Sequence, residues 1–329
     1  MERFNIWINT IIIDSRYTRK HIIRAIDDIG FHDLTDSEDY FIGNPGEGVC
    51  AKPACGKYAI PGATAAKAKR VFNGVETRVQ KRFGNNISID TSYTWSRLFG
   101  NYSGSASSDE AQRQPGGVGR NSPAVSRYFD LPFIGFTADG KPDDGLLPTD
   151  RTHFFKLSGN YRFDWWGNKN NATDFNLFYQ VGSGTPITTR ARIAGVSGQI
   201  VSKRGDLGRT GILSQTDFSM THKYRFGTEN RFGVAFDVNV LNLWNQEDEF
   251  SRRETITRNN VPPSEFGCAN VAVGDTALRC VTRAFFNGAM TSAKVLTYAN
   301  VVGNKDERYN LPQAFQAPRA IRFGFRFIF

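Results

Sequence analysis

The C-terminal stretch Arg319-Ala-Ile-Arg-Phe-Gly-Phe-Arg-Phe-Ile-Phe329 carries the clearest structural signal in the chain. Large apolar side chains occupy every second position, at Ile321, Phe323, Phe325, Phe327 and Phe329. A period of two places alternate residues on opposite faces of a β-strand. The other face holds mainly arginine and small residues. The stretch therefore predicts a strand that has lipid against its aromatic face and water against the other.

The same alternation recurs in six earlier segments, which are 70–83, 87–99, 152–163, 173–184, 213–226 and 231–245. In the last of these, Phe232, Val234, Phe236, Val238, Val240 and Trp244 share one face, opposite Asp237 and Asn239. We expect one more strand between Thr10 and Ile26, with an uncertain register at Ile11–Ile13, and assign nothing to residues 1–10. The total is about eight strands, each long enough to cross a bilayer when tilted.

The connections between these segments alternate in length. Gly84–Asn86, Trp165–Asn171 and Gly227–Asn230 are short turns. Residues 27–66, 100–151, 185–212 and 246–318 are long connections, rich in Gly, Pro, Ser and charge. Short periplasmic turns with long external loops are typical of outer-membrane barrels. The pattern predicts an all-β fold, a transmembrane antiparallel β-barrel that is here a partial barrel.

Composition agrees with strands rather than helices as the spanning elements. Charged residues make up 22% of the chain, and the net charge is +9. No stretch approaches the roughly 18 consecutive apolar residues that a membrane helix requires. Many Lys and Arg residues alternate with apolar residues instead of clustering on one surface, so we expect no nucleic-acid partner.

The four cysteines predict disulfides. Cys50 and Cys55 lie five residues apart, and Cys268 and Cys280 lie twelve apart, each pair in or beside a segment placed outside the membrane. Two local disulfides in an oxidising compartment are the favoured interpretation. A zinc site shared by both pairs is the alternative, although neither pair has Cys-x-x-Cys spacing.

No pattern of residues indicates catalysis, so we expect no enzymatic activity and no cofactor. The histidines His21, His32, His153 and His222 are dispersed, and each is expected to be structural. Asp139–Gly145 is acidic but lacks the oxygen spacing of a Ca²⁺ loop, so no metal site is assigned. Pro115–Gly119 follows no strand and opens no helix, so it is interpreted as a loop rather than a phosphate cradle.

Two groups of residues could contact a ligand. Strand residues on the water side are expected mainly to hydrate or pair inside the barrel, and could alternatively meet a plug or a ligand: Glu76, Arg78, Asp217, Lys223, Asp237 and Asn239. Ligand capture is expected on loops 100–151 and 246–318, because binding residues concentrate on loops that rigid strands position. Tyr102, Arg127, Tyr128 and Phe129 are the contacts considered there.

Several motifs together resemble a known family. They are Lys81–Arg97, Gly100–Gly104, Leu147–His153, Gly182–Pro186, Phe236–Asn245 and Pro318–Phe329, with Asn44–Gly48 a further match. In order and spacing they are similar to the C-terminal barrel of TonB-dependent outer-membrane receptors. The nearest branch is Oar-like, with an N-terminal carboxypeptidase-regulatory-like domain. The resemblance runs from about Tyr40 to the end.

This resemblance implies energised uptake of a bulky ligand through a barrel of about 22 strands that an N-terminal plug fills. It also implies that Ile321, Phe323, Phe325, Phe327 and Phe329 form the insertion signal of a closing strand. The implied partners are outer-membrane lipid, the barrel-assembly machinery and, only through a plug missing from these residues, the TonB complex. The implied location is the outer membrane.

Met1 is not followed by a secretory signal, so we expect a C-terminal piece of something longer or a gene model begun at an internal Met. We divide the chain into 1–69, a partial first strand and external loop, and 70–329, the C-terminal barrel strands. Two alternatives remain open. One is a self-contained eight-stranded barrel that acts as an adhesin or structural anchor, and the other is a soluble carbohydrate-binding β-sandwich.

Overall fold

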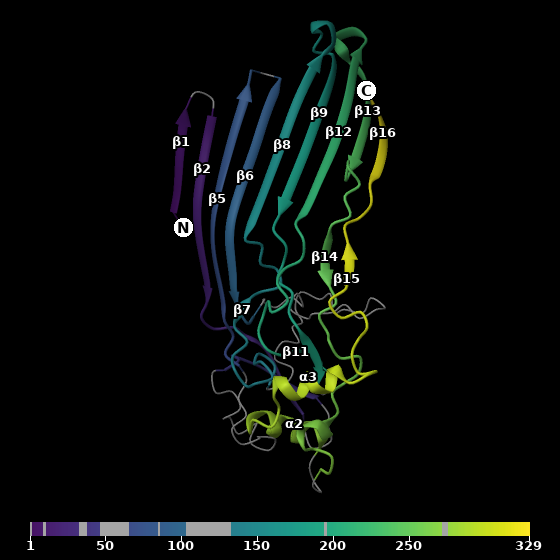
Figure 1. Ribbon diagram of the computed structural model, residues 1–329. Helices are drawn as coiled ribbons and strands as arrows, with labels where there is room; N and C mark the ends of the chain where they lie inside the picture. Colours follow the sequence, from purple (N-terminus) through teal and green to yellow (C-terminus); the bar gives the residue numbers. More distant parts are fainter. Residues whose placement is uncertain are drawn as a thin grey trace.

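The computed structural model describes residues 2–8, 11–32, 38–46, 66–84, 86–102, 133–193, 196–271 and 276–329. Its main feature is one antiparallel ten-stranded sheet, of which nine strands follow one another in chain order (Figure 1). These are β1 (Glu2–Ile8), β2 (Ile11–Ile22), β5 (Arg70–Phe83), β6 (Ile87–Gly100), β8 (His153–Asp164), β9 (Asn171–Gly182), β12 (Leu213–Phe226), β13 (Phe232–Leu241) and β16 (Ala320–Ile328). The two-residue strand β7 (Gly145–Leu146) pairs with the end of β6.

All the predicted long strands are present, with two differences. The sequence analysis left residues 1–10 unassigned, whereas β1 lies there and pairs with β2. The predicted strand 231–245 is wrong at its end, because β13 stops at Leu241. Asn242 and Asn245 have φ angles of +54° and +53°, a left-handed conformation that a strand cannot contain.

Short and long connections lie at opposite ends of the sheet (Figure 1). The short end includes the turns η3 (Trp165–Gly167) and η4 (Thr228–Asn230), and the C-terminus lies at the same end. The described parts of the long connections lie at the other end. The predicted alternation of connection length therefore corresponds to a physical separation of the two ends.

Strand register keeps apolar residues beside apolar residues across the sheet. One row of paired positions crosses seven strands, from β5 to β16, through Phe83, Ile87, Tyr161, Phe175, Met220, Val238 and Phe323. The adjacent row holds only polar residues: Arg82, Ser88, Asn160, Asn176, Ser219, Asn239 and Arg322. A slip of one residue in any strand would exchange its two faces, so the register is strongly specified. We call the first side the apolar face and the second the polar face.

The long connections fold together into what we call the loop assembly, formed by described residues 23–46, 66–69, 101–102, 133–152, 183–212 and 242–319. It holds three pairs of antiparallel strands: β3 (Asp27–His32) with β4 (Glu38–Gly43), β10 (Arg190–Ile193) with β11 (Val196–Ile200), and β14 (Glu249–Arg252) with β15 (Pro312–Phe315). It also holds η5 (Pro263–Phe266), α2 (Ala277–Phe286) and α3 (Ser292–Asn300). The sequence predicts 246–318 as a long loop, and the structure adds these helices within it.

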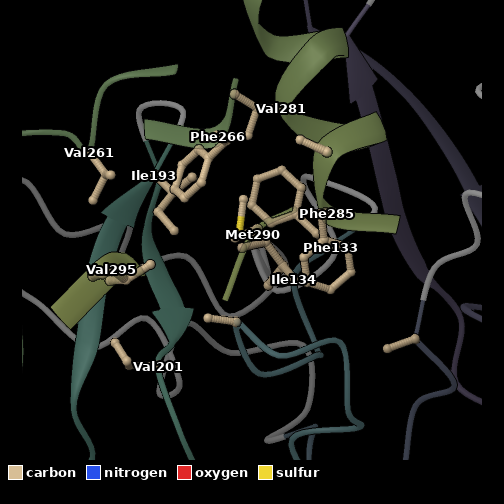
Figure 2. Close-up of a cluster of buried hydrophobic side chains, with 14 of the residues drawn as sticks. Phe133, Ile134, Ile193, Val201, Val261, Phe266, Val281, Phe285, Met290 and Val295 are labelled. Carbon is tan, nitrogen blue, oxygen red and sulfur yellow. The ribbon is translucent and has the colours of Figure 1, made fainter. Parts of the chain in front are cut away.

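A hydrophobic core lies inside the loop assembly rather than in the sheet (Figure 2). Phe133 and Phe285 are 0% and 3% exposed, and their ring centroids are 5.7 Å apart. Val281, Met290 and Val295 pack in the same cluster, so α2 and α3 both contribute to it. The loop assembly is consequently a packed structure held by apolar burial.

The sheet does not close on itself. Among the described residues, β1 pairs only with β2, and β16 pairs only with β13, so both are edge strands. The fold is all-β with an open antiparallel sheet. Within the described part of the chain, no helix is long and apolar enough to cross a membrane.

Candidate functional site: the two-faced sheet and its loop assembly

The apolar face exposes an unusual number of large side chains. Phe236, Phe323 and Phe325 are 41%, 71% and 73% exposed. Removing such a side chain from water contributes about 1.5–3 kcal/mol. A surface of this kind is stable when it lies against hydrocarbon, with water on the other side of the sheet.

The residues assigned to a C-terminal insertion signal all lie at this surface. Ile321, Phe323, Phe325 and Phe327 are in β16, on the same face, and Phe329 follows it. Phe323 stacks against Phe236 with ring centroids 6.4 Å apart. The aromatic stripe of the edge strand thus continues the surface of β13.

The polar face carries ion pairs and hydrogen bonds that connect neighbouring strands. Arg16 of β2 pairs with Glu76 of β5 at 2.5 Å. Arg78 Nε donates to Asp90 of β6 at 2.9 Å. At the opposite edge of the sheet, on the same face, Arg326 pairs with Asp237 at 3.2 Å. Each pair neutralises opposite charges on adjacent strands and so stabilises the register of the sheet.

The six predicted water-side residues all belong to this face or its edge, but they do not form one cluster. Lys223 pairs with Asp174 at 3.3 Å, and Thr221 donates to Asp237 at 2.7 Å. Asp217 accepts from the backbone of Asn242 at 2.8 Å and thereby fixes the end of β13. Glu76 and Arg78 are in the pairs above, and Asn239 lies opposite Ser219. These six residues therefore pair with neighbours along the polar face and do not converge on one point.

The described histidines lie apart from one another, and two of them contact hydroxyl groups of neighbouring strands. Three of the four histidines are on different strands: His21 on β2, His153 on β8 and His222 on β12. His153 Nδ1 is 2.7 Å from the Tyr93 hydroxyl, and His222 Nδ1 is 2.9 Å from the Thr173 hydroxyl. The side chain of His32, like the whole of Pro115–Gly119, lies outside the described residues.

The carboxylates of the acidic segment Asp139–Gly145 form ion pairs or hydrogen bonds with neighbouring elements. Asp143 pairs with Arg204 at 3.3 Å, and Asp144 with Lys69 at 2.6 Å. Asp139 accepts from the backbone of Ser292 at the start of α3, at 2.8 Å. Among the described residues, no group of three or more His, Cys, Asp or Glu side chains could hold a metal ion.

Cys268 and Cys280 are joined by a disulfide, with an S–S distance of 1.99 Å. The bond ties α2 to the segment that follows η5, beside the core of the loop assembly. Cys50 and Cys55 lie outside the described residues.

Buried ion pairs join distant connections of the loop assembly. The side chains of Arg204 and Asp143 are 0% and 1% exposed. Arg253 pairs with Asp306 at 3.1 Å across two segments of the last connection. Burial tends to raise the pKa of Asp306, but hydrogen bonds from Arg308 and the charge of Arg253 lower this pKa to about 2.

Glu254 lies in the same region and accepts from Arg190 at 3.1 Å and from the backbone of Thr188 at 2.8 Å. Burial raises the pKa of Glu254, and the charge of Arg190 opposes that shift. Buried charges of this kind lose solvation and therefore depend on their partners. The loop assembly is specified by these pairs as well as by its core.

Of the four predicted ligand contacts, Tyr102 alone lies among the described residues. Tyr102 is 3% exposed and belongs to the core of the loop assembly. Arg127, Tyr128 and Phe129 lie outside the described residues. A pocket of about 380 Å³ opens instead where β2 and β5 meet the loop assembly. Its lining includes His21, Ile23, Lys67, Lys69 and Phe136.

The sequence analysis also missed two arginines on the apolar face. Arg97 lies two residues after Trp95 and therefore on the same face of its strand, and Arg19 lies two residues after Tyr17 in the same way. The alternation rule could have placed Arg97 there. Arg19 required the pairing of β2 with β5, because the alternation near Ile11–Ile13 is ambiguous.

The fold and its surfaces define a class: an all-β protein with an open antiparallel sheet, one face apolar and the other polar, and a packed loop assembly at one end. Comparison with known proteins adds a relationship. The chain is similar to the TonB-dependent transporter Oar of Myxococcus xanthus, with 27% identity over 331 residues that cover 96% of this chain and 26% of that protein. No protein-family model and no solved structure matches.

The chain thus spans about a quarter of the length of the curated relative that it matches. The similarity supports a relationship with TonB-dependent receptors at the family level, and it agrees with the resemblance seen in the motifs.

Proposed function

We propose that this chain forms part of the barrel wall of a TonB-dependent outer-membrane transporter, with the loop assembly on the external side. One observation carries this proposal. Paired rows of residues cross seven strands with entirely apolar side chains in one row and entirely polar side chains in the next. A wall between lipid and a wet lumen has this composition.

The open sheet favours part of a larger barrel over a self-contained one. A closed barrel of eight or nine strands would pair its first strand with its last. In the described chain, β1 and β16 lie on opposite sides of the sheet (Figure 1). Further strands of a longer polypeptide would pair with these edges. The length of the M. xanthus relative supports the same proposal.

A soluble β-sandwich would cover the apolar face with a second sheet. The small sheets β3–β4, β10–β11 and β14–β15 do not do this, since they lie with the loop assembly at the end of the main sheet (Figure 1). The adhesin or anchor alternative has no observation in its favour beyond the strand number.

The finer parts of the proposal rest on the motifs and the relative. They are an Oar-like receptor, a C-terminal position in it, a location in the outer membrane and energised uptake of a bulky ligand. The TonB complex would act through a plug elsewhere in the polypeptide. Outer-membrane lipid and the barrel-assembly machinery are the other partners, and we assign no catalytic role.

Channel conductance tests the proposal. The complete polypeptide that contains this chain is purified from the outer membrane with its plug segment deleted, and is inserted into planar bilayers. A barrel of about 22 strands leaves a wide lumen when it is emptied, whereas eight strands close around their own side chains. We expect a large, stable conductance. A polypeptide that has no strands beyond these and conducts no ions would contradict the proposal.

A further inference from the structure

The apolar face carries two arginines that form no ion pair with a described carboxylate. Arg19 of β2 and Arg97 of β6 lie on either side of Asn73 of β5, as its direct cross-strand neighbours. Both are exposed, and neither has an ion-pair partner in the described part of the chain. Arg16 and Arg78 on the polar face each have one.

From β2 to β16, the charged side chains of the apolar face are all basic. Apart from tyrosines, the ionisable residues of this face are Arg19, His21, Lys81, Arg97, His153 and His222. No carboxylate occupies a position of this face on those strands. On β1, Glu2 lies at a register position of the same face, opposite Tyr17. Cations on a surface that meets lipid are stabilised by an anionic partner.

The two arginines lie directly beyond an aromatic row. Tyr17, Val75 and Trp95 are paired across β2, β5 and β6, and the next row of this face towards the loop assembly is Arg19, Asn73 and Arg97. Aromatic residues with a polar edge concentrate at the level of lipid headgroups. The arginines are therefore at the height of the headgroup phosphates.

The next row adds an aromatic ring and a histidine, and a lysine lies beside them. Phe99 lies opposite Val71, which lies opposite His21. The guanidinium of Arg97 is 5.0 Å from the centroid of the Phe99 ring, and Lys69 Nζ is 5.3 Å from it. Lys69 also pairs with Asp144 at 2.6 Å, so its charge is partly balanced.

The pocket of about 380 Å³ adjoins this cluster, because His21 and Lys69 line it. Its other lining residues are mostly apolar and include Ile22, Ile23, Ala66 and Ala68. Asp144, the partner of Lys69, also lines the pocket. A lining that combines lysines with apolar side chains fits an amphiphile that bears phosphate groups.

We infer that Arg19, His21, Lys69 and Arg97, defined here as the cationic cluster, bind the phosphate groups of a phosphorylated glycolipid of the outer leaflet. Two strand spacings separate the arginines by about 10 Å, which is wider than one phosphodiester and suits a headgroup with two phosphates. The cluster lies at the end of the sheet that carries the loop assembly. The inference rests on the proposed membrane orientation of the sheet.

Lipid binding is measured by native mass spectrometry after the complete polypeptide has been reconstituted in three kinds of phosphatidylcholine vesicle. The first contains lipopolysaccharide, the second phosphatidylglycerol, and the third neither lipid. The test variant is Arg19→Gln with Arg97→Gln. The matched control is Lys81→Gln with Arg82→Gln, which removes the same charge from the short-turn end of β5. Heat-modifiable gel migration reports whether each variant has inserted.

We expect the wild type to retain lipopolysaccharide in preference to phosphatidylglycerol. The test variant should insert normally and bind lipopolysaccharide at least about 10-fold more weakly for each charge-assisted hydrogen bond lost. The control should bind as the wild type does. Equal binding by the two double variants, or no preference for lipopolysaccharide over phosphatidylglycerol, would overturn the inference while leaving the transporter wall intact. Failure of the wild type to insert would overturn both proposals.

Discussion

At the scale of single residues, charged side chains are placed differently in the sheet and in the loop assembly. In the sheet, charges lie mainly on the polar face, where water reaches them. In the loop assembly, Arg204, Asp143, Arg253 and Asp306 are buried as pairs. A buried pair is costly to break, because the remaining charge has neither water nor a partner. The loop assembly should therefore be sensitive to the loss of one carboxylate.

Asp306→Asn should destabilise the loop assembly by about 3 kcal/mol, because Arg253 stays buried without its counter-charge. Glu307→Gln changes the exposed neighbouring carboxylate and should leave stability unchanged. Thermal unfolding of the detergent-solubilised protein, followed by near-ultraviolet circular dichroism at neutral pH, compares the two. Equal melting temperatures would show that the buried pair contributes nothing.

The pKa of Asp306 also gives a pH dependence. Its folded pKa, about 2, lies below its ordinary value of 3.8. A depressed pKa contributes stability that is present above the unfolded value and is lost as the pH falls through the folded one. The stability advantage of the wild type over Asp306→Asn should thus persist above about pH 4 and shrink towards pH 2. An advantage that does not change between these values would argue against the ion pair.

At the scale of elements, the sequence predicts strands much better than it predicts the loop assembly. Alternation over ten or more residues is a local signal, and both 70–83 and 213–226 match β5 and β12 at each end. The helices α2 and α3 were missed because the surrounding Gly and Pro residues suggested an irregular loop. Local signals were nevertheless present. Thr276 and Thr291 accept hydrogen bonds at the helix N-termini, each from a backbone N–H at 3.3 Å.

Contacts between distant connections left no such signal. The hydroxyls of Thr189 and Tyr309 are 2.6 Å apart, although 120 residues separate them. Arg204 reaches the backbone carbonyl of Asn101 at 3.1 Å, over 103 residues. Pairs like these depend on how the strands bring the connections together, so a single sequence cannot reveal them. The same limit hid the cationic cluster, whose arginines come from β2 and β6.

The disulfide between Cys268 and Cys280 should stabilise the position of α2. A disulfide that closes a loop of this length lowers the conformational entropy of the unfolded chain, which stabilises the folded state by about 3 kcal/mol. Cys268→Ser with Cys280→Ser should therefore increase amide hydrogen exchange in α2 and in the neighbouring η5, while exchange in β12 stays unchanged. Hydrogen-exchange mass spectrometry of the membrane-inserted protein measures both regions. Unchanged exchange in α2 would mean that core packing alone fixes the helix.

At the scale of the whole molecule, apolar residues are divided between two environments. Those of the loop assembly are buried against one another, as Phe133 and Phe285 are. Those of the sheet remain exposed on one face over the eight strands from β2 to β16. A soluble protein would not expose a continuous apolar surface of this extent. The division follows if hydrocarbon surrounds the sheet and water surrounds the loop assembly.

Spin labels at consecutive positions of β13 test this division most directly. Labels are placed singly at Phe236, Asp237, Val238 and Asn239 of the membrane-inserted protein, and collisions with oxygen and with a water-soluble nickel complex are measured. We predict that positions 236 and 238 favour oxygen, which concentrates among acyl chains, and that positions 237 and 239 favour nickel or are shielded from both reagents. Four positions that respond alike, with no alternation, would contradict a sheet that has lipid on one face and water on the other.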